Sequence, residues 1–114
     1  MKSFDYDMAM QVSDCDLELF GELIEIFDDQ QKQHIKDLES AISAGNFAQF
    51  ELVAHALKGA LRNLGAMASA EVARTLEQLG REKDLERAKS LIQELESEIK
   101  KFRTQVDHIS TGGE

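Results

Sequence analysis

The stretch LERAKSLIQELESEIKKFRTQVDHI, residues 85–109, decides the fold class of this chain. Its apolar side chains recur at alternating steps of three and four residues: Leu85, Ala88, Ile92, Leu95, Ile99, Phe102, Val106 and Ile109. This spacing puts them all on one face of an α-helix, and such a seam is what a helical bundle or a coiled coil buries. The sequence therefore predicts a long amphipathic helix packed along other helices.

The residues upstream predict four more helices joined by short turns. A short helix is expected near residues 5–11, and Ser13 and Asp14 are start signals for a long second helix. The second helix has its own seam of apolar residues, at Leu17, Phe20, Ile24, Phe27, Ile35, Leu38 and Ile42. The remaining boundaries follow from turn-forming residues: Ala44-Gly45-Asn46 before a helix over 47–64, Gly65 before a helix over 67–79, and Gly80 with Asp84 as the next stop and start.

The chain has no proline and no run of alternating β-branched and aromatic residues, so strands are not expected. Long amphipathic helices with short connections indicate an all-α fold, an up-down-up-down antiparallel four-helix bundle with a short extra N-terminal helix. We expect residues 1–114 to form a single domain, with the bundle over about 15–109 and a disordered tail over 110–114.

Composition narrows the possible partners and the compartment. Thirteen basic residues against 22 acidic ones give a net charge of −9, which disfavours nucleic acid and anionic membranes and favours a protein partner. No membrane span or signal peptide is evident, and the lone Cys15 has no disulfide partner within the chain. We expect a soluble cytoplasmic protein that is a monomer.

His55 stands out on the predicted third helix. On a helical wheel the apolar residues of this helix form an arc that must face the core: Phe50, Val53, Ala54, Leu57, Ala60, Leu61 and Leu64. His55 points the opposite way, into solvent. A further set lies within about 60° of it: Ala48, Glu51, Leu52, Lys58, Gly59 and Arg62.

This face suits a particular chemistry. Because an unperturbed imidazole has a pKa near ~6.5, an exposed histidine is mostly a neutral nucleophile at cytoplasmic pH. Lys58 and Arg62 are cations that can balance a phosphoryl group on that nitrogen, and Gly59 leaves the helix surface open to another protein's backbone. The wheel alone favours an ordinary surface histidine whose neighbouring cations only solubilise the helix.

The motif around His55 favours the functional interpretation. The run AHALKG at residues 54–59, followed by ALRNLGA at 60–66, resembles the signature of histidine phosphotransfer (HPt) domains. The resemblance extends over nearly the whole chain. Further residues that match the family are Phe27, the Ala44-Gly45-Asn46 turn, Leu76-Glu77 before Gly80, and Asp84-Leu85.

The resemblance implies a set of roles. His55 would be the phosphorylated residue, Lys58 would steady the phosphoryl oxygens, with Arg62 as a secondary cation, and Gly59 would clear room for a docking receiver domain. The landing surface around it would comprise Leu52, Ala48 and Glu51. Family members often have a glutamine on the fourth helix that bonds the imidazole, and this sequence offers Glu77 or Gln78 instead.

The resemblance also implies partners and the absence of a cofactor. The protein would carry phosphate between receiver-domain aspartates in a multistep two-component phosphorelay that starts at a hybrid histidine kinase. The family's magnesium belongs to the receiver, so no cofactor and no metal are expected here. Nothing in the sequence resembles the ATP-binding boxes of a kinase, so the phosphate would not come from ATP.

Two other classes of protein compete with this interpretation. A di-metal bundle needs Glu three residues before its histidines, whereas Gln31, Leu52 and Gln105 precede His34, His55 and His108. A non-catalytic helical-bundle or coiled-coil adaptor that binds a partner protein is the alternative reading, because the last helix has a clean heptad-like seam.

Overall fold

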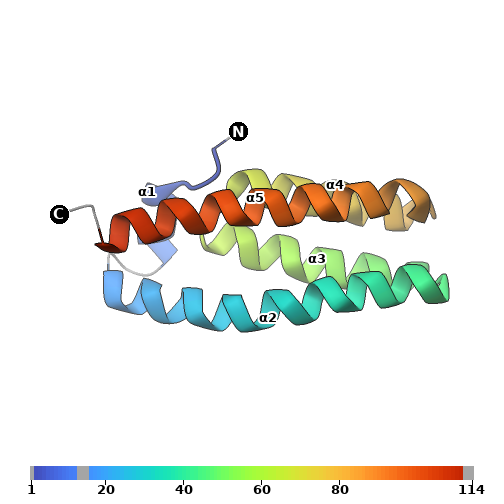
Figure 1. The fold of residues 1–114 in the computed structure, drawn as a ribbon, viewed down its shortest axis with the longest axis horizontal. Helices are drawn as coiled ribbons and strands as arrows, with labels where there is room; N and C mark the ends of the chain where they lie inside the picture. The colour runs from blue at the N-terminus through green and yellow to red at the C-terminus, as the bar shows by residue number, and fades with distance from the viewer. Residues whose placement is uncertain (1, 13–15, 112–114) are drawn as a thin grey trace.

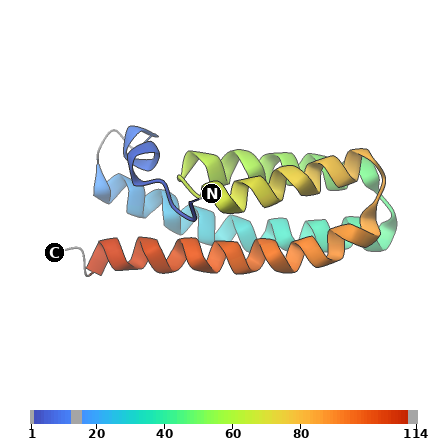
Figure 2. The same ribbon diagram turned by 90° about the horizontal axis from the view of Figure 1, so that it is seen from above.

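The structure, a computed structural model, describes residues 2–12 and 16–111, and all regular elements in these ranges are helices (Figure 1). The elements are α1 (Tyr6–Val12), α2 (Leu17–Ala44), α3 (Phe47–Asn63), α4 (Met67–Arg81) and α5 (Leu85–Thr111). Helices α2 to α5 run up and down along one another, and α1 lies across one end of the bundle (Figures 1 and 2). The predicted all-α fold, a four-helix bundle with a short N-terminal helix, is confirmed.

Short polar side chains and one glycine set the ends of α2 and α3. The N-cap of α2 is Asp16, whose side chain accepts a hydrogen bond of 3.1 Å from the backbone N–H of Leu19. The expected start signals, Ser13 and Asp14, lie outside the described residues. At the other end of α2, Gly45 adopts a left-handed φ of 64°, and Asn46 caps α3 by accepting from Gln49, as the sequence predicts.

Helix α4 does not stop at Gly80, so that part of the sequence-based prediction is wrong. The helix continues to Arg81, and the chain turns at Lys83, which has a φ of 62°. Gly80 serves packing instead: a Cβ atom on it would lie 2.9 Å from Cδ1 of Phe50 in α3. The missing side chain therefore lets α3 and α4 approach closely along the length that carries the site.

The core lies between the four long helices. Every seam residue of α5 from Leu85 to Val106 is buried, and the ring of Phe102 packs edge-on against Phe4 and Phe27, at centroid distances of 5.5 and 6.3 Å. Leu17 is an exception to the predicted seam of α2, with 54% of its surface exposed. Its turn of α2 lies beyond the end of the α3–α4 pair, so these two helices do not cover it (Figure 1).

The segment before α1 ties the N-terminal end to the α3–α4 turn. The backbone N–H of Asp5 donates to the carbonyl of Gly65 at 2.6 Å, and that of Ala68 donates to Lys2 at 2.8 Å. At the other terminus α5 runs to Thr111, two residues into the stretch 110–114 for which the sequence predicts disorder, while 112–114 and Cys15 lie outside the described part. No helix in the described part is long and apolar enough to cross a membrane.

Candidate functional site

His55 stands on the outer side of α3, as the wheel predicts. Its side chain is 64% exposed, whereas Ala54 and Leu57 on the opposite side of the helix are fully buried. The ring is therefore open to a partner molecule without any movement of the bundle.

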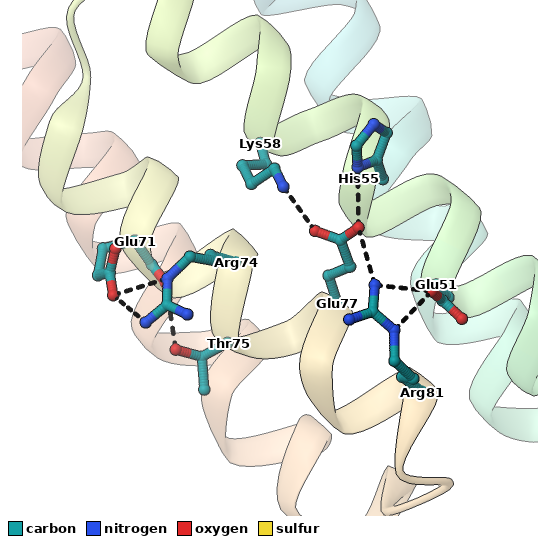
Figure 3. Close-up of polar contacts among 8 residues, drawn as sticks. All are labelled: Glu51, His55, Lys58, Glu71, Arg74, Thr75, Glu77 and Arg81. Atoms are coloured by element: carbon teal, nitrogen blue, oxygen red, sulfur yellow. Dashed lines mark hydrogen bonds and ion pairs between the residues drawn. The ribbon is translucent and has the colours of Figure 1, made fainter.

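One ring nitrogen of His55 is bound to a carboxylate of the neighbouring helix. Nδ1 lies 2.8 Å from Oε2 of Glu77 in α4, and Glu77 itself is only 8% exposed (Figure 3). Of the two residues that the sequence offered for this contact, Gln78 is not the one: its side chain is exposed and donates to Glu82. Glu77 is therefore the residue of α4 that contacts the imidazole.

The second oxygen of Glu77 is bound to Lys58. The Nζ atom of Lys58 lies 2.8 Å from Oε1, so the carboxylate bridges the imidazole and the ammonium group (Figure 3). Burial pushes the pKa of Glu77 upward, but hydrogen bonds from Lys58 and His55, together with their charges, hold it below the usual glutamate range. Glu77 is therefore ionised at neutral pH.

The ionised carboxylate determines which ring nitrogen is free. A carboxylate can only accept hydrogen bonds, so Nδ1 of His55 must carry the proton in the contact with Glu77. In the neutral ring the lone pair is then on Nε2. Nε2 is the nitrogen that points away from Glu77 (Figure 3). The site therefore presents a nucleophilic nitrogen on the exposed side of the ring.

Arg81 belongs to the same cluster, although it was not predicted from the sequence. Its guanidinium binds Oε2 of Glu51 in α3, with both Nε and one terminal nitrogen at 3.1 Å, and the same terminal nitrogen lies 3.7 Å from Oε2 of Glu77. The signal that could have found it is the spacing: an acid followed four residues later by a base favours contact along one helix face. Glu51, expected as a docking residue, is therefore also a structural partner of α4.

The structure does not bring Arg62 to the imidazole. Arg62 lies seven residues after His55, roughly 10 Å further along the helix, and its charge acts on Glu71 near the start of α4. No hydrogen bond or ion pair between Arg62 and His55 occurs among the described residues. Its secondary role remains a prediction.

The expected docking residues form an open surface beside the ring. Leu52 is 64% exposed, Ala48 and Gly59 are exposed, and nothing lies within 4 Å of a Cβ built on Gly59. A mainly apolar groove continues this surface between α3 and α2; its lining residues are Leu23, Ile26, Phe27, Gln30, Ala60, Asn63 and Leu64.

The described residues include no group of three or more histidine, cysteine or acidic side chains arranged to hold a metal ion. The cluster around His55 instead combines one ring, two carboxylates and two cations. Because the carboxylates are engaged by Lys58 and Arg81, the arrangement suits a nucleophilic imidazole with nearby positive charge.

Comparison with known proteins identifies the family of this chain. The model of the Hpt domain family matches residues 22–105, which include all of α3 and α4 and the His55 cluster. The chain belongs to this family of histidine phosphotransfer domains, as its sequence motif implied. Proteins of the family work with receiver domains and histidine kinases in phosphorelays.

A solved structure supports the fold. The chain is similar to the crystal structure of histidine-containing phosphotransfer protein B (HptB) from Pseudomonas aeruginosa PAO1, with a TM-score of 0.84 and 24% sequence identity. The match covers 93% of this chain and 92% of that one. A search of curated protein sequences gives no match.

Proposed function

We propose that this protein carries a phosphoryl group on Nε2 of His55 between the aspartates of receiver domains in a multistep phosphorelay. The observation that carries the proposal is the bridging carboxylate: Glu77 binds Nδ1 of an exposed ring and so leaves Nε2 free as the nucleophile. The family to which the chain belongs supports the same chemistry.

The proposed step is in-line attack of Nε2 on the phosphorus of a receiver's aspartyl phosphate. The N–P bond forms as the bond from phosphorus to the aspartate oxygen breaks, and the electron pair leaves with that carboxylate. Nδ1 keeps its proton, so the phosphorylated ring carries a positive charge that faces the Glu77 carboxylate at 2.8 Å. Transfer to a second receiver reverses these bond changes.

Lys58 is the cation that we assign to the phosphoryl oxygens. It follows His55 by three residues on the same helix, so its flexible side chain can reach a phosphoryl group on the His55 ring. In the free protein Lys58 is bound to Glu77, and it would exchange that partner for the incoming phosphoryl group. Arg62 is a second, more distant cation that would help to balance the negative charge of the phosphoryl group.

The receiver would dock over the open surface beside His55. Gly59 allows close backbone approach, and Leu52 and Ala48 offer apolar contact, with polar residues of α2 at the edge. Catalytic carboxylates and magnesium would come from the receiver, and this chain would need no cofactor of its own. A hybrid histidine kinase would supply the phosphate at the head of the relay, and the carrier would act as a monomer.

The proposal is tested with purified receiver domains that carry a labelled phosphoryl group. The wild-type chain should take up label that is acid-labile and base-stable, as expected for phosphohistidine. His55→Gln should take up none and keep its helical content, because the ring is exposed. His34→Gln, the matched histidine control, should still be labelled.

Two outcomes would contradict the proposal. Label on His55→Gln would place the phosphoryl group elsewhere. A wild-type chain that binds receivers but never takes up label would support the alternative, an adaptor without transfer chemistry.

A further inference from the structure

The Glu77 carboxylate needs a cation at every stage of the proposed reaction. It is almost fully buried, and burial alone would favour its neutral form. A protonated Glu77 could donate a hydrogen bond rather than accept one, and Nδ1 of His55 would lose its fixed role as donor. The orientation of the ring therefore depends on keeping this carboxylate charged.

Lys58 cannot supply that charge throughout. In the free protein its ammonium group binds Oε1 of Glu77 at 2.8 Å. When it turns to the phosphoryl group, which carries more negative charge than Glu77, Oε1 loses its hydrogen-bond donor. Until the N–P bond forms and the ring itself becomes cationic, another cation must offset the charge of Glu77.

Arg81 lies in the position to do so. One terminal nitrogen is 3.7 Å from Oε2 of Glu77, and the guanidinium is held there by hydrogen-bonding distances of 3.1 Å to Glu51 on the facing helix (Figure 3). Arg81 is on the side of Glu77 away from Nε2 of His55. It can thus remain with Glu77 while Lys58 leaves.

We propose that Arg81, held by Glu51, is a positioning residue that keeps Glu77 ionised and bound to His55 while Lys58 serves the phosphoryl group. This inference rests on the proposed function. The charged and titratable groups that the described contacts put around Glu77 are His55, Lys58 and Arg81, with Glu51 behind Arg81. Removal of Lys58 therefore imitates the stage at which it has turned away.

The test measures the titration of the Glu77 carboxyl by carbon-13 NMR on unphosphorylated protein. With Lys58→Ala alone, Arg81 should hold the pKa of Glu77 in the acidic range. Adding Arg81→Ala should raise it by about one unit or more, the effect of losing an opposite charge within ~4–6 Å. Arg81→Lys in place of Arg81→Ala keeps the positive charge, so the pKa of Glu77 should stay close to its value in Lys58→Ala alone.

Arg74→Ala is the matched control in the Lys58→Ala background. Arg74 is an arginine of the same helix with its own ion-pair partner, Glu71, and it makes no contact with the His55 cluster in the described structure. It should leave the titration of Glu77 unchanged. If Arg81→Ala has no more effect than Arg74→Ala in this background, the inference is overturned.

Two further measurements guard against trivial outcomes. Should the double variant fail to fold, Arg81→Gln in the Lys58→Ala background removes the charge but keeps a polar side chain, and should raise the pKa of Glu77 in the same direction. An unchanged titration there overturns the inference as well. Nitrogen-15 shifts of the His55 ring should show the proton on Nδ1 in each variant that keeps Glu77 ionised.

The phosphotransfer readout separates this inference from the function on which it rests. Arg81→Ala should slow label uptake by about two- to threefold relative to Arg74→Ala, no more than full loss of the Glu77 charge, because the ring is less well oriented. If the wild type takes up label and these two variants are equally fast, the inference fails and the proposed function stands. If the wild type takes up none, the function fails, while the titration still reports on Arg81.

Discussion

Gly80 of α4 packs directly against the backbone of Glu51 in α3: a Cβ atom at position 80 would lie 3.2 Å from the backbone nitrogen of Glu51 and 3.3 Å from its Cα. This close approach occurs one residue before Arg81 and three residues after Glu77, the two side chains of α4 that reach the His55 cluster. The packing of a glycine therefore sets the helix spacing at which the cluster can form.

Gly80→Ala should destabilise the fold. The new methyl group would meet the fully buried ring of Phe50 at 2.9 Å as well as backbone, so the helices must move apart. Overpacking of this kind costs about 1–3 kcal/mol, more than the gain in helix propensity of about 1 kcal/mol. Urea denaturation should give a lower free energy of unfolding.

The control for this substitution is Gly59→Ala. Nothing lies within 4 Å of a Cβ at this helical position, so only the propensity gain remains. The free energy of unfolding should rise by about 0.5–1 kcal/mol. A destabilised Gly59→Ala, or an unaffected Gly80→Ala, would contradict the packing seen here.

Substitutions at Glu77 should separate the effect of its hydrogen bond to His55 from the effect of its negative charge. Glu77→Ala removes the acceptor for Nδ1 of His55, and phosphoryl uptake from a receiver should fall by about tenfold, a change of ~1.4 kcal/mol in activation free energy. Glu77→Gln keeps one acceptor oxygen, which His55 and Lys58 must share, so uptake should fall by only about threefold. Rapid-quench measurements should give the fastest uptake for the wild type, slower uptake for Glu77→Gln and the slowest for Glu77→Ala. Equal rates would contradict an orienting role for Glu77.

The sequence alone predicted most of the fold and the central residue of the site, for identifiable reasons. The seam of α5 has a period that only a helix satisfies, and the exposure of His55 follows from the wheel of one helix. Gly80 was misread because a glycine can end a helix or let two helices touch, and one helix's sequence does not distinguish these. Arg81 was missed because its contact with Glu51 depends on how two helices cross.

Gly59→Glu should block docking and leave the histidine intact. The position is exposed, four residues after His55, and open to a partner's backbone, so a charged side chain there would occupy the space of the receiver. Affinity for the receiver, measured by titration calorimetry, should fall by tenfold or more, ~1.4 kcal/mol. Gly21→Glu is the matched control, because Gly21 is also an exposed helical glycine with nothing within 4 Å of its Cβ. Equal affinities for the two variants would place the docking surface elsewhere.

The ion pair of Glu77 should make stability depend on pH in the acid range. Because the pKa of Glu77 is lower in the folded chain than its ordinary value of about 4.3, the unfolded state binds the proton more readily. The ionised group therefore contributes stability above that ordinary value, and the contribution is lost as pH falls through the lower, folded pKa. The Glu77→Gln variant lacks this contribution to stability at every pH.

Urea denaturation at a series of pH values measures this contribution as the difference between wild type and Glu77→Gln. At neutral pH the wild type should be more stable by about 1.5–3 kcal/mol, the usual range for hydrogen bonds to a charged group. The difference should be constant down to about pH 5, shrink below ~4.3 and level off in stronger acid. Glu71→Gln is the control, because Glu71 pairs with Arg74 on the exposed side of α4 and its charge is screened by water. A difference for Glu77→Gln that stays constant through the acid range would mean that Glu77 is not the ionised bridge between His55 and Lys58.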